Sequence, residues 1–145
     1  MDRLILFIKE GEIHTQKIKK ALNKLPKTIR NIEEYEETLD SLAFRFSRLQ
    51  GLLGEKIFKE YLNFTLRDTE GKDFLEILRM LEKEGILNIE EWREFRKIRN
   101  FIFHDYPLDE EEKLEAINFL TNNAQKLINI FETIKAKIEA HTRRD

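Results

Sequence analysis

The feature of this sequence that most constrains its fold is the spacing of its apolar residues, which recur every three or four positions over nearly the whole chain. That period matches the turn of an α-helix and predicts helices that each bury one side. No stretch alternates between apolar and polar residues as a half-buried strand does. Hydrophobic residues make up 41% of the 145 residues, which is enough to build the core of one domain. We therefore expect an all-α fold, an up-and-down bundle of four to five helices in a single domain over residues 1–145.

The ends of the expected helices are marked by residues that cap or interrupt a helix. Gly51 and Gly54 favour a bend in the long second segment. Gly85 is placed to end the third helix, and Asn88 and Asp109 are placed to cap the helices that follow them. On these signals, helices are expected over residues 4–25, 28–66, 74–84 and 89–103, and from residue 109 onward.

Composition and motifs exclude several classes of function. The chain carries 26 Lys and Arg against 28 Asp and Glu, a net charge of −2, so any binding of nucleic acid must use a local basic patch. It has no Cys, which removes thiolate catalysis and Cys-based metal sites. There is no glycine-rich phosphate loop, and the three His residues are too scattered to form a metal pair, so we expect no cofactor and no metal. Without a signal peptide or a run of roughly 18 apolar residues, we expect a cytoplasmic protein that does not enter a membrane.

One short segment, residues 99–106, combines residue types that can perform chemistry: it reads Arg-Asn-Phe-Ile-Phe-His-Asp-Tyr. Arg99 carries a permanent charge and can hold a phosphate through two parallel hydrogen bonds. His104 has an unperturbed pKa of about 6.5, which suits proton transfer near neutral pH. Together these two side chains are sufficient to cleave RNA without a metal, because the imidazole can deprotonate a 2′-hydroxyl while the guanidinium stabilises the phosphorane.

Helix geometry sets a condition on this hypothesis. Five residues of α-helix turn through about 500°, so Arg99 and His104 lie roughly 140° apart around the axis. Asn100 and His104, four residues apart, do share a face, and Asn100 is therefore a candidate supporting residue that fixes the imidazole tautomer or binds phosphate. For Arg99 to meet His104, the long Arg side chain must bridge the gap, the helix end must unwind, or a second copy must contribute. A two-fold homodimer would bring two motifs together across one groove.

Each of these residues also has a purely structural interpretation. A His at the end of a helix commonly interacts with the C-terminal dipole, and a Tyr before a Pro, as at Tyr106, can plug the end of a bundle. Arg93, Arg96 and Lys97 concentrate positive charge on the same helix, but residues opposite a buried face are often simply solvated. The hypothesis of a functional site therefore depends on the segment as a whole.

A known motif resembles this segment without gaps: the Arg-x4-His-x-Tyr motif of HepT-type proteins, which belong to the HEPN (higher eukaryote and prokaryote nucleotide-binding) superfamily. The context is similar as well, since the motif ends the penultimate long helix of an all-α chain and an amphipathic helix follows it. The resemblance covers about residues 28–140, and the helix within residues 1–25 is not diagnostic. The motif positions are matched by Arg99, Asn100, His104 and Tyr106.

The resemblance implies a specific function. HepT-type proteins are toxins of toxin–antitoxin pairs, metal-independent endoribonucleases that cleave mRNA or tRNA as homodimers. Their catalytic residues correspond to Arg99 and His104. Their antitoxin, MNT, is a minimal nucleotidyltransferase that transfers AMP from ATP onto the motif tyrosine, here Tyr106, and so places negative charge where the RNA phosphates bind. RNA is thus the implied substrate, and a separately encoded nucleotidyltransferase antitoxin is the implied partner.

Two other functions stay open at this point. Related helical bundles with nearly the same motif are described as substrate-binding subunits of nucleotidyltransferases, in which Arg99 and His104 would hold a nucleotide or the partner without catalysis. In the third interpretation, the chain is a helical interaction protein and the motif is only the end of a helix. Cleavage of RNA in the presence of EDTA separates the first function from the second.

Overall fold

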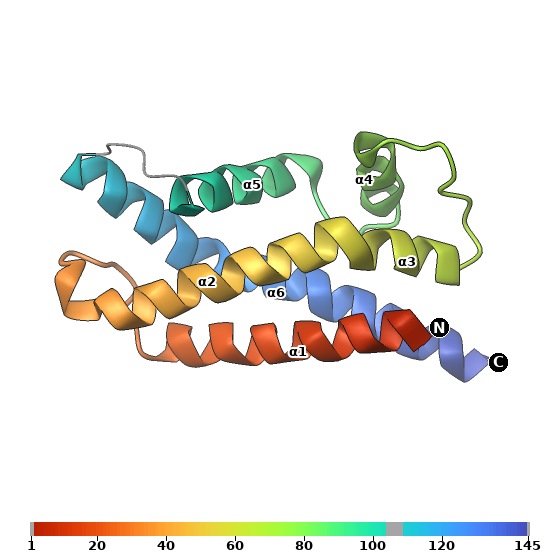
Figure 1. Cartoon of the computed structure of the whole chain (residues 1–145), viewed down its shortest axis with the longest axis horizontal. Helices are drawn as coiled ribbons and strands as arrows, with labels where there is room; N and C mark the ends of the chain where they lie inside the picture. Colours follow the sequence, from red (N-terminus) through yellow and green to blue (C-terminus); the bar gives the residue numbers. More distant parts are fainter. Residues whose placement is uncertain (1, 104–108, 145) are drawn as a thin grey trace.

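The computed structural model describes residues 2–103 and 109–144, with the backbone alone for residues 102, 103 and 144. These residues confirm the predicted all-α helical bundle, and no strand occurs among them. The α-helices of the described ranges are α1 (Asp2–Asn23), α2 (Glu36–Leu52), α3 (Phe58–Phe64), α4 (Phe74–Lys83), α5 (Ile89–Phe103) and α6 (Glu110–Arg144) (Figure 1).

The helices run up and down around a rod formed by α2, a π-helical turn (Leu53–Ile57) and α3. Figure 1 shows α1 and α5 on opposite sides of α2, with the long α6 crossing behind them. The sequence predicts a bend near Gly51 and Gly54, and the structure has the π-helical turn there. In this turn the N–H of Phe58 donates to the carbonyl of Leu53, five residues earlier, and the rod continues as a helix.

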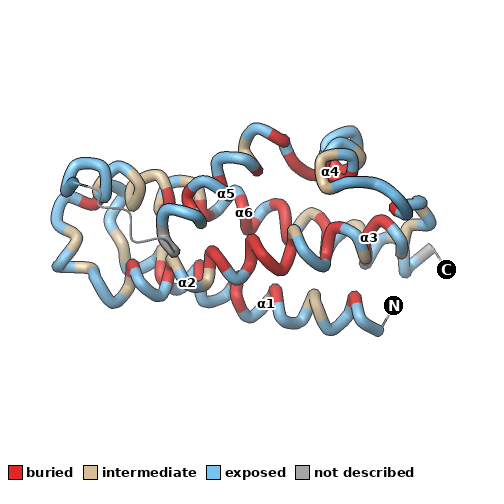
Figure 2. The backbone as a smooth tube through the Cα atoms, turned by 45° about the horizontal axis from the view of Figure 1, so that its top comes forward, coloured by how far each residue is buried: buried red, intermediate tan, exposed pale blue. Residues whose placement is uncertain are grey.

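The core lies where the helices face one another in the middle of the bundle, as the buried segments of α1, α2 and α6 show in Figure 2. Trp92 of α5 packs against Phe58 of the rod with ring centroids 4.8 Å apart, and Phe95 packs against Phe46 at 5.9 Å. These aromatic contacts fix α5 against the rod and so position the residues that follow on α5. Within the described ranges, no helix is long and apolar enough to cross a bilayer.

The structure corrects the predicted start of the second helix. The apolar spacing predicts helix over residues 28–32, but α2 begins only at Glu36, after a single 3₁₀ turn (Glu33–Tyr35). Asn118 of α6 accounts for the difference: its side-chain oxygen accepts from the N–H of Ile29 (2.7 Å) and its side-chain nitrogen donates to the carbonyl of Ile29 (3.0 Å). Both backbone groups of Ile29 are therefore used outside a helix, and its side chain is buried.

The predicted caps of the later helices are confirmed. Gly85, which follows the C-cap residue Glu84 of α4, has a φ of +80°, a left-handed conformation that a residue with a β-carbon adopts only at a cost. Asn88 accepts a hydrogen bond from the N–H of Glu91 (3.1 Å), and Asp109 accepts one from the N–H of Glu112 (2.8 Å). The cap at Asn88 satisfies a backbone N–H of the first turn and so sets where α5 begins.

Helix α4 is tied to the end of the rod by four polar side chains that we call the Glu84 junction: Tyr61, Arg67, Glu84 and Lys137. The carboxylate of Glu84 accepts hydrogen bonds from the Tyr61 hydroxyl (2.6 Å) and the Arg67 guanidinium (2.7 Å), and the Lys137 ammonium lies 4.0 Å away. Burial of Tyr61 and its bond to Glu84 raise the pKa of its hydroxyl. Each side chain of the junction therefore has a partner.

Candidate functional site

The structure places part of the predicted motif. Arg99 and Asn100 lie on the last turns of α5, where Arg99 is half-buried and Asn100 is exposed. His104 and Tyr106 lie outside the described residues. Three expectations therefore stay predictions: the meeting of Arg99 with His104, the support of His104 by Asn100 and the location of Tyr106.

The guanidinium of Arg99 lies against the backbone of α2 at Gly51. A β-carbon at Gly51 would stand 3.1 Å from Nη2 and 3.4 Å from Cζ of Arg99, so a larger residue there would displace the guanidinium. Among the described residues, no carboxylate lies within 4.0 Å of Arg99 to form an ion pair. The positive charge of Arg99 thus lies against the backbone of α2 and is available to an anion.

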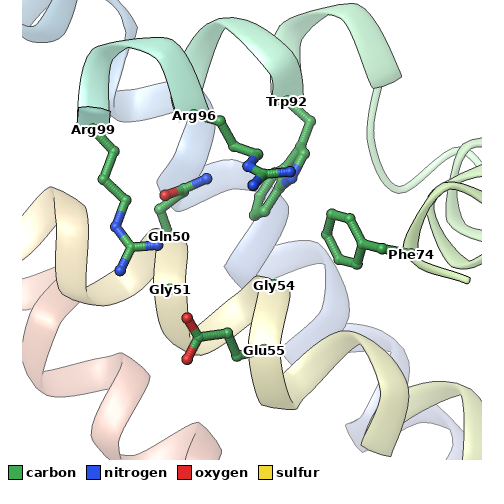
Figure 3. A pocket seen from close by; sticks show the side chains of 8 residues that line it. All are labelled: Gln50, Gly51, Gly54, Glu55, Phe74, Trp92, Arg96 and Arg99. Carbon is green, nitrogen blue, oxygen red and sulfur yellow. The ribbon is translucent and has the colours of Figure 1, made fainter. Parts of the chain in front are cut away.

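Arg99 belongs to the wall of a cleft of about 250 Å³ between α2 and α5, which we call the α2–α5 cleft. Side chains from α5 form one wall, the rod forms the opposite wall and the floor, and an aromatic ring of α4 stands at one end (Figure 3). The lining residues are Gln50, Gly51, Gly54, Glu55, Phe74, Trp92, Arg96 and Arg99.

The local sequence of the rod makes room for this cleft. A β-carbon at Gly54 would stand 3.1 Å from the ring of Trp92, so the indole packs directly on the helix backbone. The π-helical turn begins at Leu53, beside the cleft. Turns of this kind occur frequently at functional sites. Two glycines one helical turn apart, next to a π-helical turn, bring the side chains of α5 close to the rod.

The cleft carries net positive charge in a chain that is slightly acidic overall. Two arginines line it against a single carboxylate, that of Glu55. The guanidinium of Arg96 lies 5.9 Å from the centre of the Phe74 ring, within the range of a cation–π interaction. The basic patch considered from the sequence also included Arg93, but Arg93 pairs with Glu90 at 2.8 Å and does not line the cleft.

Two residues of the cleft that the sequence does not single out carry buried polar atoms without partners. Gln50 is 2% exposed and Trp92 is 1% exposed, and neither Oε1 of Gln50 nor Nε1 of Trp92 has a hydrogen-bond partner among the described residues. Each such atom destabilises a folded protein by about 1–3 kcal/mol. A signal for Gln50 does exist in the sequence, since it falls four residues after Phe46 on the buried face of α2, where an apolar residue is expected.

A second polar group lies on the other side of α2, against α1. His14 is buried, and its Nδ1 accepts a hydrogen bond from Arg45 (3.2 Å), because a guanidinium can only donate. Nε2 of His14 lies 3.7 Å from the carboxylate of Glu10. Burial lowers the pKa of His14, which favours the neutral imidazole. This group holds α1 against α2, and we assign no chemistry to it.

Comparison with known proteins does not assign the chain, because no family model, no curated protein and no solved structure matches it. In the part of the chain that the structure describes, no three His, Asp or Glu side chains gather as a metal site requires. The function of the α2–α5 cleft is therefore argued from its own geometry and from the motif.

Proposed function

We propose that this protein is the toxin of a toxin–antitoxin pair and cleaves RNA without a metal ion, as its resemblance to HepT-type proteins implies. The observation that carries the proposal is the placement of Arg99. Its guanidinium stands in the wall of the α2–α5 cleft beside a second arginine, Arg96, and has no ion-pair partner among the described residues. An arginine in this position is suited to bind the phosphate of an RNA strand.

The proposed reaction is an internal transfer at phosphorus. The 2′-oxygen of a ribose attacks the adjacent phosphorus while His104 takes its proton, and the bond from phosphorus to the 5′-oxygen of the next nucleotide breaks. The departing oxygen takes a proton from the imidazolium or from water, so the products end in a 2′,3′-cyclic phosphate and a 5′-hydroxyl. Arg99 stabilises the additional negative charge of the phosphorane, and Asn100 supports the imidazole four residues later.

The proposed regulation uses Tyr106 and a partner. A nucleotidyltransferase antitoxin transfers AMP from ATP onto the Tyr106 hydroxyl, with release of pyrophosphate, and the added phosphate repels RNA. Incubation with ATP and the partner should add whole AMP units to the mass of the wild-type chain and none to Tyr106→Phe. We further propose that the active form is a cytoplasmic homodimer, in which the motifs of two copies share one groove.

The decisive test is RNA cleavage by the purified chain in EDTA. The wild type should yield cyclic-phosphate ends, and Arg99→Ala and His104→Ala should each lower the rate on the order of a hundredfold. Arg93→Ala is the matched control, because Arg93 lies on the same helix but is exposed and paired with Glu90. It should cleave at the wild-type rate. Full activity in Arg99→Ala, or an equal loss in Arg93→Ala, would contradict the proposal.

The groups that line the cleft favour a second candidate function, a nucleotide-binding subunit of a nucleotidyltransferase without catalysis of its own. The lining groups of the cleft, which include an arginine and a buried amide, are able to bind a small ligand whether or not a catalytic imidazole is present. In that case the wild type leaves RNA intact in EDTA but binds nucleotide, and Arg99→Ala weakens the binding.

A further inference from the structure

The proposed cleavage uses Arg99 and His104. It gives no role to the two buried polar atoms of the cleft without partners among the described residues, Oε1 of Gln50 and Nε1 of Trp92. An apolar residue at position 50 would fill the same space without a buried amide that lacks a partner. Gln50 and Trp92 both line the α2–α5 cleft, so a ligand in the cleft can reach this wall. Buried polar atoms left unpaired beside an open cleft indicate a ligand that supplies the missing partners.

The position of Gln50 relative to the two arginines indicates what part of a ligand it meets. In Figure 3 its amide stands between the guanidinium group of Arg99 and that of Arg96. Gly51, the next residue on the rod, has no side chain, and the guanidinium of Arg99 occupies the space above it. A ligand that reaches the Gln50 amide therefore passes beside Arg99, which is positioned to bind a phosphate attached to it.

The size and surfaces of the cleft restrict the ligand further. Its volume of about 250 Å³ is smaller than the roughly 300–1,000 Å³ of pockets that enclose drug-sized molecules, so it suits one ring system. Phe74 and the guanidinium of Arg96 offer flat faces on which a ring can stack. The Gln50 amide has a donor and an acceptor in one plane, which matches the edge of a nucleobase.

We propose that the α2–α5 cleft binds one nucleobase of a nucleotide, with the Gln50 amide hydrogen-bonded to the ring edge and Arg99 bound to the phosphate. Gln50 is then a specificity-determining residue. The inference rests on the proposed function for RNA as the source of the nucleotide, and the binding of the base does not itself require cleavage.

The chain contains a single tryptophan, Trp92, and its place in the wall of the cleft makes its fluorescence a direct reporter of occupancy. The purified chain is titrated with the four nucleoside monophosphates and with ribose 5-phosphate, which has the sugar and the phosphate but no base. We expect a saturable change with at least one monophosphate. Ribose 5-phosphate should bind roughly tenfold more weakly, because it makes no contact with Gln50.

Two variants with the same chemical change separate recognition from a general effect. Gln50→Leu keeps the bulk of the side chain and removes its polar atoms, so it should weaken binding of the preferred monophosphate roughly tenfold. Gln16→Leu makes the same change on the exposed face of α1 and should leave the affinity unchanged. Thermal unfolding adds a second readout, since a purely structural role for Gln50 predicts that Gln50→Leu melts at a lower temperature, whereas our inference predicts an equal or higher one.

Three results would overturn the inference: wild-type affinity in Gln50→Leu, equal affinity for ribose 5-phosphate and the monophosphates, or no change of fluorescence with any of them. None of these results depends on RNA cleavage. A chain that binds a monophosphate through Gln50 but leaves RNA intact would reject the proposed catalysis and support base binding.

Discussion

The Glu84 junction and the α2–α5 cleft both include residues of the rod, but they differ in whether their buried polar atoms have hydrogen-bond partners. In the junction, the carboxylate of Glu84 satisfies both Tyr61 and Arg67. In the cleft, Oε1 of Gln50 and Nε1 of Trp92 are buried without partners among the described residues. Folding normally pairs buried polar groups, as the junction does. The contrast indicates that the junction stabilises the fold, while the cleft is kept open at some expense of stability.

Removal of the shared carboxylate should break the junction and give the largest loss of stability. In Glu84→Ala the hydroxyl of Tyr61 and the guanidinium of Arg67 lose their acceptor, so we expect the free energy of unfolding in urea to fall by about 2–3 kcal/mol. Glu55→Ala is the matched control from the cleft, and its exposed carboxylate should change stability by no more than about 0.5 kcal/mol. Equal losses in the two variants would remove the distinction between the regions.

Alkaline pH should weaken the junction through Tyr61. Burial and the bond to Glu84 raise the pKa of the Tyr61 hydroxyl in the folded chain above its usual value of about 10. As pH rises, the unfolded chain therefore loses this proton first. The contribution of Tyr61 to the free energy of unfolding is complete below about pH 10. Above that pH it declines by up to about 1.4 kcal/mol per pH unit. Urea unfolding from about pH 9 to pH 11 measures the decline, and Tyr61→Phe should flatten it. An equally steep decline in that variant would refute the assignment to Tyr61.

Filling the floor of the cleft should have the smallest effect on stability, and with the opposite sign. Gly51→Ala gains up to about 1 kcal/mol of helix propensity, and its β-carbon meets only the flexible end of Arg99, which can move. We expect a slightly higher melting temperature together with weaker nucleotide binding. Gly54→Ala is the control, because its β-carbon meets the buried ring of Trp92, which cannot move, and should not be stabilising. If Gly54→Ala were stabilised, the ring of Trp92 would have to move as easily as the end of Arg99, and the distinction between the two glycines would fail.

The helices were predictable because each buries one side, and that periodicity is local information. Their caps at Gly85 and Asn88 were predictable for the same reason. The loop at residues 28–32 was not, since the partner that holds Ile29 is Asn118, far along the chain. Periodicity alone also cannot tell whether a glycine on a helix face leaves a gap in the packing or is required because another helix packs against it.

Gly11 illustrates this limit. On the apolar face of the first helix it reads as a gap, but a β-carbon there would overlap the ring of Phe131 on α6. The candidate site also has one part that the sequence predicts and one part that only packing creates. Arg99 could be selected from its motif, whereas the cleft that it lines combines Gln50 and Gly51 of the rod with Trp92 of α5. Only the packing of α5 on the rod brings these residues together, and the motif contains no information on that packing.

The π-helical turn in the middle of the rod has a consequence for how this chain can diverge. A π-turn holds one residue more than an α-turn, so deletion of any single residue from Leu53–Ile57 would allow the rod to close into regular α-helix. Because the extra residue is accommodated within one turn, the parts of the rod before and after it would keep nearly the same orientation about the helix axis. Deletion of a residue from the regular helix of α3 ahead of Tyr61 would instead rotate Tyr61 by about 100°, away from Glu84. Homologous chains that retain both regions can therefore differ by one residue in this turn, but not in α3 between the turn and Tyr61.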